Sequence, residues 1–189
     1  LRLFIIINAS HSCAEFSVKS IEHAYEANPS HTSSQQKLQQ DFQTYQSFAR
    51  STRTLNAKIR MLTQLFRQRP YVFDPAGDDT HGDFDTSPSI NTQAFDCMTY
   101  INTLLAFLQS TDFNTMQTHH TRIRYKTEEK RYFNRHHFMS VDWNRYNVAK
   151  KYIQDITHTV VDAQHKTLAK TITTPILRKP WLAFQSKLL

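Results

Sequence analysis

The chain has 189 residues, and its 23 Lys and Arg against 16 Asp and Glu give a formal net charge of +7 at pH 7. A length within the usual domain size of about 100–200 residues, with 39% hydrophobic and 21% charged residues, predicts one globular domain and excludes a disordered chain or a coiled coil. No apolar run approaches the roughly 18 residues of a membrane-spanning helix, and the two glycines exclude the glycine-rich loops that bind nucleotide phosphates.

Residues 1–14 combine a short apolar run, LRLFIIIN, with the small residues that follow it. This pattern resembles the end of a secretory signal peptide, and the alternative is an N-terminal β-strand. On the first interpretation the protein is exported to the periplasm, residues 15–189 form a single domain, and Cys13 is removed with 1–14. Cys97 then has no cysteine partner within the chain, so it is either a buried structural residue or a reactive thiol.

The first half of the chain is predicted to be largely helical. A short helix is expected over 15–26. Over 35–69 the apolar residues recur every three or four positions, apart from one seven-residue step between Phe48 and Leu55, which is typical of an amphipathic helical segment. Pro70 ends this segment, and the prolines and glycines that follow predict a loop as far as Asn91.

A further helix is predicted to begin at Cys97, because Asp96 is a suitable N-cap and the apolar residues behind it share one face: Met98, Ile101, Leu105 and Leu108. Residues 123–126 and 130–133 flank a polar turn and predict a β-hairpin. Residues 143–156 and 160–170 have mixed patterns that favour helix. Together these segments predict a helix-rich α+β fold.

Cys97 is the strongest candidate for chemistry in this sequence. The positive end of a helix dipole and the unpaired N–H groups of a first helical turn favour a thiolate, which is the form in which cysteine acts as a nucleophile. The alternative is a buried structural cysteine, because a free thiol packs like a small apolar side chain. Helical geometry allows the sulfur to face either way, so the spacing of the residues leaves both interpretations open.

A cysteine nucleophile also needs a base, which is usually a histidine held by a third polar group. Six histidines follow Cys97, and their spacing alone does not single out the base. His136 and His137 are adjacent, so on a strand they would point to opposite faces and only one could reach the thiol. Zinc is not expected, because the sequence has no cysteine pair and no HExxH helix.

Four blocks of sequence carry a resemblance to a known family. They are QRPYVFDPAGD (68–78), AFDCMTYINTLLAF (94–107), RIRYK (122–126) and RHHFMSVDWN (135–144), the last followed by YIQDIT (152–157). In this order they resemble the N-acetylmuramoyl-L-alanine amidase-like family, which are bacterial cell-wall cysteine hydrolases of the NlpC type on a papain-like fold. The resemblance covers about half of the chain, from Phe66 to Thr157.

The resemblance implies an exported enzyme that cleaves the amide between the lactyl group of N-acetylmuramic acid and the L-Ala of the stem peptide. Its partner is then peptidoglycan or a muramyl-peptide fragment, and no cofactor or metal is implied. Cys97 matches the family nucleophile. The substrate pocket is assigned to motif positions matched by Tyr71, Arg135, His137, Asp142 and Trp143, and for Asp142 and Trp143 a framework role is equally open.

The sequence departs from the family pattern at the catalytic base. In this family the catalytic histidine comes well after the last block, on a strand that begins with Ser-His and an apolar residue before Gly. This chain has no glycine after Gly82, so that segment is missing, and the C-terminal sheet of the NlpC-type fold is expected to be absent or truncated. The chain is thus either the N-terminal portion of a longer enzyme or a degenerate member, with His137 as a substitute base. We expect weak activity or none, because losing general acid–base catalysis costs about 10²–10⁴-fold.

Two other functions stay open. One is a peptidoglycan-binding relic that keeps the pocket but has lost its base. The other is a basic helical protein that binds nucleic acid, which the net positive charge permits. The basic residues are scattered rather than clustered, so a solvated surface is the simpler interpretation and nucleic acid is not the expected partner.

Overall fold

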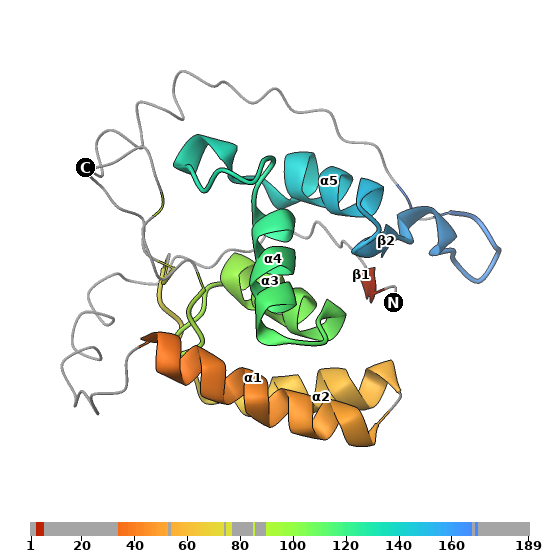
Figure 1. Cartoon of the computed structure of the whole chain (residues 1–189). Coiled ribbons are helices and arrows are strands. Elements are labelled where there is room, and N and C mark those ends of the chain that lie inside the picture. The colour runs from red at the N-terminus through yellow and green to blue at the C-terminus, as the bar shows by residue number, and fades with distance from the viewer. Residues whose placement is uncertain are drawn as a thin grey trace.

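A computed structural model describes residues 3–5, 34–52, 54–73, 75–76, 85, 90–167 and 169. Within these residues the chain forms five α-helices and two short strands, so the predicted helix-rich character is confirmed (Figure 1). In chain order the elements are β1 (Leu3–Ile5), α1 (Ser34–Ser51), α2 (Leu55–Phe66), α3 (Cys97–Gln109), α4 (Phe113–Arg124), α5 (Asn144–Ala149) and β2 (Ile153–Asp155). No helix in these ranges is both long enough and apolar enough to span a membrane.

The helical segment predicted over 35–69 is two helices rather than one. Helices α1 and α2 pack side by side in opposite directions (Figure 1). The break falls at residues 52–54, inside the seven-residue step between Phe48 and Leu55. Thr54 begins α2 as its N-cap, and its hydroxyl accepts a hydrogen bond from the Ala57 N–H at 3.4 Å. The gap in the apolar pattern therefore marks the turn between two helices.

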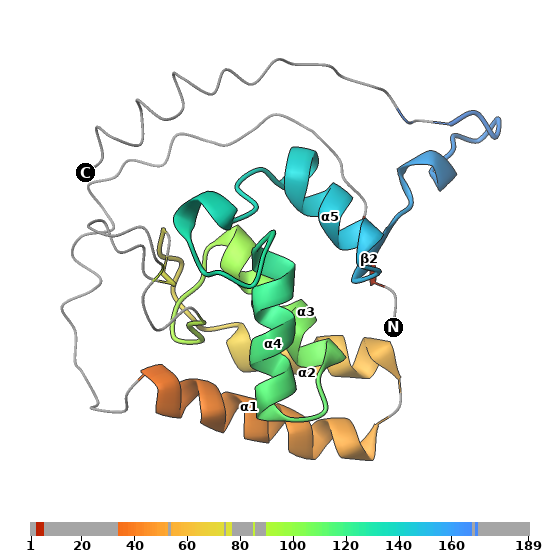
Figure 2. The same cartoon turned by 45° about the horizontal axis from the view of Figure 1, so that its top comes forward.

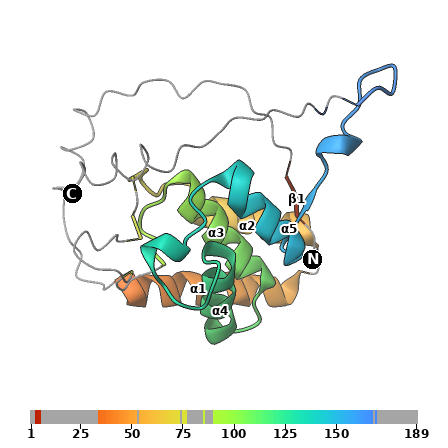
Figure 3. The same ribbon diagram turned by 90° about the horizontal axis from the view of Figure 1, so that it is seen from above.

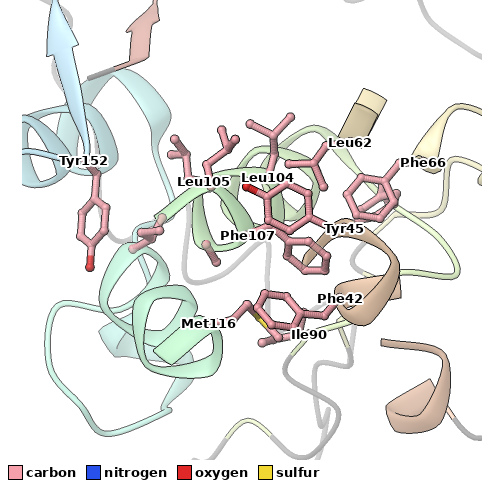
Figure 4. Packing of buried hydrophobic residues seen from close by; sticks show 14 of the residues in the cluster. Phe42, Tyr45, Leu62, Phe66, Ile90, Leu104, Leu105, Phe107, Met116 and Tyr152 are labelled. Atoms are coloured by element: carbon pink, nitrogen blue, oxygen red, sulfur yellow. The ribbon is translucent and has the colours of Figure 1, made fainter. Parts of the chain in front are cut away.

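Helix α3 lies at the centre of the molecule, between α2 and α4 (Figure 2). The predicted start at Cys97 and the predicted N-cap Asp96 are both confirmed. Residues 104–108 are all buried, which is more than one face of a helix, because neighbours cover α3 on several sides. Figure 4 shows its side chain Phe107 among Phe42 and Tyr45 of α1 and Phe66 of α2.

Helix α4 was not predicted, and it replaces the first strand of the predicted hairpin. Asp112 caps it, and it runs through polar residues to Arg124, with Met116, His120 and Ile123 buried along one face. The helix was missed because its buried residues are not all apolar: His120 occupies a core position, and threonines surround it. The prediction of a hairpin over 123–126 and 130–133 is therefore wrong. The structure has only a single antiparallel bridge in this part of the described chain, between Tyr125 and Arg135.

The end of the described chain is less helical than predicted. A wide turn at Met139–Trp143 leads into α5, which ends at Ala149, and residues 160–169 contain a bridge between Val161 and Thr167 instead of a helix. Strand β2 pairs in parallel with β1, Leu3 opposite Ile153, at the end of the molecule near α5 (Figure 3). This pairing fits the alternative of an N-terminal strand, while the signal-peptide interpretation stays a prediction. The helix predicted over 15–26 and Cys13 lie outside the described residues.

Candidate active site

Cys97 is the first residue of α3, and its side chain is exposed. Asp96 and Thr99 fix this helix start reciprocally. The Thr99 N–H donates to the Asp96 carboxylate at 2.7 Å, and the Asp96 N–H donates to the Thr99 hydroxyl at 2.9 Å. This capping box holds the thiol at the solvent-facing end of a rigid helix, so the alternative of a buried structural cysteine is excluded.

The same helix start presents backbone donors beside the sulfur. Within α3 the Thr99 N–H is bound by Asp96, and the Tyr100 N–H donates to the Asp96 carbonyl at 3.0 Å. The N–H groups of Cys97 and Met98 have no acceptor inside the helix, as for the first residues of any α-helix. Such donors suit a developing negative charge on a carbonyl oxygen.

Tyr71 lies beside the segment that leads into Cys97. Residues 70–72 run parallel to Phe95, with the Phe95 N–H donating to the Pro70 carbonyl and the Val72 N–H to the Phe95 carbonyl, both at 3.1 Å. The Tyr71 side chain is 61% exposed, and Phe73 is 81% exposed. The structure therefore brings the predicted pocket residue Tyr71 close to the helix that begins with Cys97.

His137 is held within its own segment. Its Nε2 donates to the Tyr132 carbonyl oxygen at 2.7 Å, since a carbonyl can only accept, which leaves Nδ1 as the basic nitrogen of the neutral ring. Its backbone N–H donates to the Asp142 carboxylate at 3.2 Å. Burial lowers the pKa of His137, which favours the neutral form of the ring. A neutral imidazole has the proton-accepting form that a general base requires.

Asp142 shapes the turn that carries His137. One carboxylate oxygen accepts from the Phe138 N–H at 2.9 Å, and the other accepts from the His137 N–H and lies 3.6 Å from the Lys126 ammonium. These bonds close the wide turn at Met139–Trp143 against the preceding segment. The contacts favour the framework role that the sequence left open for Asp142.

Trp143 is fully buried, so its indole ring is part of the core. Its Nε1–H donates to the side-chain Oδ1 of Asn102 on α3 at 2.8 Å. This bond connects the turn before α5 to the middle of the helix that begins with Cys97. The burial favours a framework role for Trp143 over direct contact with a substrate.

Arg135 is also largely buried, and its partner is a residue that sequence reasoning missed. The Arg135 Nε lies 2.5 Å from the Asp85 carboxylate, which also accepts a hydrogen bond from the Tyr125 hydroxyl. The guanidinium lies 5.4 Å from the centre of the Tyr132 ring. Nothing in the sequence distinguishes Asp85 from the other aspartates of the segment GDDTHGDFD. Its partner Arg135 lies 50 residues further along the chain, so no local pattern indicates the pairing.

The other histidines near α4 and α5 are buried or partly buried. His120 is buried in α4, and His119 bonds the Tyr152 hydroxyl through Nδ1 at 2.8 Å. His136 stacks on Tyr146, and burial lowers its pKa to about 4. The described residues contain no group of three or more His, Cys, Asp or Glu side chains that could hold a metal ion.

The comparison with protein families gives a match over most of the chain. The family model described as N-acetylmuramoyl-L-alanine amidase-like matches residues 61–177. The chain belongs to this family. The match contains Cys97, Arg135, His137, Asp142 and Trp143 in addition to Tyr71, and it extends beyond the blocks that carried the resemblance.

A solved structure shares the fold of this amidase-like chain. It is the crystal structure of protein LPG0564 from Legionella pneumophila str. Philadelphia 1, assigned to the family DUF1460, with a TM-score of 0.64 and 24% sequence identity. The match covers 71% of this chain and 45% of that one, so the matched part spans less than half the length of the neighbour. Among proteins with curated descriptions, none matches this chain.

Proposed function

We propose that this amidase-like chain carries the nucleophile of a cysteine hydrolase of the NlpC type, on part of a papain-like fold. Its substrate is the amide that joins the lactyl group of N-acetylmuramic acid to the L-Ala of a stem peptide. The observation that carries the proposal is the exposed Cys97 thiol at the first residue of α3, beside backbone donors and Tyr71. Family membership supports the class of substrate.

The chemistry follows from this geometry. The Cys97 sulfur adds to the lactyl carbonyl carbon, and the N–H groups at the start of α3 stabilise the negative oxygen that forms. The carbon–nitrogen bond then breaks, the L-Ala nitrogen takes a proton and leaves as an amine, and a thioester remains on Cys97. Water adds to the thioester, releases the lactyl carboxylate and returns the proton to the sulfur.

The reaction needs a group that takes the thiol proton and gives it to the leaving amine. The Asp96 carboxylate next to Cys97 opposes a thiolate, so the helix dipole alone does not replace this group. His137 is the residue of the described segment that we propose for this role, through Nδ1. We expect hydrolysis by this chain to be slow, because the Ser-His segment that supplies the base in this family is not found in it.

We also propose where the protein meets its substrate and which features of the chain assist binding. We propose that the protein is exported to the periplasm, where its target polymer lies. The net charge of +7 suits an anionic wall fragment and raises the rate of encounter with it at low ionic strength. The exposed Tyr71 ring is proposed to contact the substrate next to the bond that is cleaved.

The test is hydrolysis of a muramyl-L-alanyl peptide, followed by mass spectrometry of the released peptide. In a Cys13→Ser background, Cys97→Ala is expected to abolish release while the binding affinity for the peptide is kept. Release that is unchanged in Cys97→Ala contradicts the proposal. Binding without any release in the parent protein favours the peptidoglycan-binding relic, and oligonucleotide binding that outcompetes the muramyl-peptide favours the nucleic-acid alternative.

A further inference from the structure

We propose that Asp85 is a positioning residue of this site, which connects the part of the chain before Cys97 to the segment that carries His137. The inference rests on the proposed function for its catalytic consequence. Asp85 makes three contacts to one stretch of chain. Its backbone N–H donates to the Lys130 carbonyl at 2.7 Å, and its carboxylate binds Arg135 and accepts from the Tyr125 hydroxyl.

Asp85 belongs to the loop that ends at the nucleophile. The base of this loop is closed where the Asn91 side-chain amide donates to the Pro75 carbonyl at 2.8 Å. A few residues later, Phe95 pairs with residues 70–72, and Asp96 caps α3, which begins at Cys97. Along the chain, Asp85 therefore lies between Pro75 and Asn91, whose contact precedes the segment that leads into Cys97.

The partners of Asp85 lead to His137 on the other side. Arg135 lies over the Tyr132 ring, and the Tyr132 carbonyl accepts the hydrogen bond from His137 Nε2. Tyr125 and Arg135 also face each other across the antiparallel bridge. A continuous set of contacts thus runs from Asp85 through Arg135 and Tyr132 to the imidazole that we propose as the base.

The chemistry of the cluster favours a positioning role over a purely stabilising one. The side chains of Asp85 and Arg135 are 3% and 7% exposed, and burying two charges costs about as much free energy as their attraction returns. A buried ion pair instead fixes the direction of its groups, because only one geometry satisfies both charges. Burial raises the pKa of Tyr125 to about 12, so its hydroxyl keeps the proton that it donates to Asp85.

The first test compares Asp85→Asn with Asp41→Asn in the full chain. Asp41 is a matched control, because it is a buried carboxylate paired with Arg69 at 3.4 Å but lies on α1. We expect Asp85→Asn to speed amide hydrogen exchange at residues 92–97 and 132–138 by about tenfold or more, whereas Asp41→Asn leaves the amides of 132–138 unchanged. Exchange that does not change in Asp85→Asn overturns the inference.

The second test separates position from stability. The triple variant Asp85→Leu, Arg135→Met and Tyr125→Phe replaces the charged cluster by apolar groups, and we expect its melting temperature to be kept. Its kcat on the muramyl-L-alanyl peptide is expected to fall by about ten- to a hundredfold with little change in KM, because misplaced reacting groups lower the rate. A kcat within about twofold of the parent overturns the inference. A parent chain without hydrolysis contradicts the proposed function alone, and hydrogen exchange then decides on Asp85.

Discussion

The helices before Cys97 and the segment after α4 are held together by different contacts. In the first region, α1, α2 and α3 meet through aromatic rings, and Phe107 lies 5.2 Å from Phe42, 5.6 Å from Phe66 and 5.7 Å from Tyr45, between ring centres (Figure 4). We call this set the aromatic layer. Burial raises the pKa of Tyr45 to about 12, so the layer stays uncharged over the ordinary range of pH.

In the second region, buried polar side chains connect α4, α5 and the turn between them. Trp143 bonds Asn102, and the Asn147 amide donates to the carbonyls of Ile123 and Trp143 at 3.2 and 2.9 Å. His120 of α4 and His136 of the segment before α5 are buried as well. We call this set the polar junction. It depends on the protonation of its members, whereas the aromatic layer does not.

The two proposed reacting residues lie in the two different regions. Cys97 stands on α3, which the aromatic layer holds rigidly, and His137 stands on the segment that the polar junction holds. In the proposed site, the nucleophile therefore lies on a helix packed by aromatic rings, and the proposed base lies next to buried polar groups. Three changes to the chain test this contrast.

The largest effect is expected from opening the aromatic layer. Phe107→Ala removes a ring that is fully buried, and we expect the free energy of unfolding to fall by about 3–5 kcal/mol, because the lost burial adds to the cost of a cavity. Urea unfolding measures this loss. The control Phe133→Ala removes a ring that is 58% exposed and should cost less than about 1 kcal/mol. Similar losses in both variants would contradict the assignment of Phe107 to the core.

A smaller effect is expected when the polar junction is acidified. Burial lowers the pKa of His136 to about 4 and holds the pKa of His120 well below its usual value, so the folded state binds fewer protons than the unfolded state. The stability that these neutral rings contribute is complete above the unfolded pKa of about 6.5 and is lost as the pH falls toward the folded values. We expect the free energy of unfolding to fall by roughly 1–3 kcal/mol between pH 7 and pH 5.

The variant His136→Phe identifies the source of this pH dependence. It keeps an aromatic ring on Tyr146 but removes one titrating group, so the decrease in stability between pH 7 and pH 5 should become smaller. The control His158→Gln removes an exposed imidazole and should leave that decrease unchanged. If the two variants behave alike, the acid sensitivity does not come from the polar junction.

The contrast between the two regions also explains what the sequence could predict. The residues of the aromatic layer recur at helical spacing within each helix, so the amphipathic pattern over 35–69 and the N-cap of α3 at Asp96 could be predicted from the sequence. In the polar junction the helical spacing of buried residues is difficult to recognise from the sequence. His120 occupies a core position in α4, and the threonines around it are equally common in loops and strands. The exposed position of Cys97 depended on neighbouring helices that the local pattern does not contain.

The residues of the predicted site also divide into those that the local sequence indicates and those that only the fold reveals. Residues that follow each other along the chain, such as Asp96 and Cys97, could be assigned from capping preferences alone. The pairing of Asp85 with Arg135 joins positions 50 residues apart, and no local sequence pattern predicts it. Trp143 and Asp142 were found by resemblance, but their roles required burial and hydrogen-bond partners that only the fold supplies.

The smallest effect on stability is expected at the two helix starts, which carry the same capping box. Asp96 caps α3 and Asp112 caps α4, each with a threonine three residues later. Asp96→Ser and Asp112→Ser both keep a side-chain oxygen for the cap, so each should change the free energy of unfolding by only about 0.5 kcal/mol. Thermal unfolding of the two variants checks this expectation.

The two caps are expected to differ in their effect on the thiol. Asp96→Ser removes a negative charge next to Cys97, and in a Cys13→Ser background the rate of Cys97 alkylation by iodoacetamide at pH 7 should rise by roughly two- to fivefold, since an exposed charge a few ångströms away contributes about 1 kcal/mol. Asp112→Ser changes a similar cap at the start of another helix and should leave the rate unchanged. An equal rise in both variants would mean that the reactivity of Cys97 follows the general stability of the helices. A rise in Asp96→Ser alone would show that the nucleophile is restrained by its own cap, and therefore that its activation depends on a base supplied from outside α3.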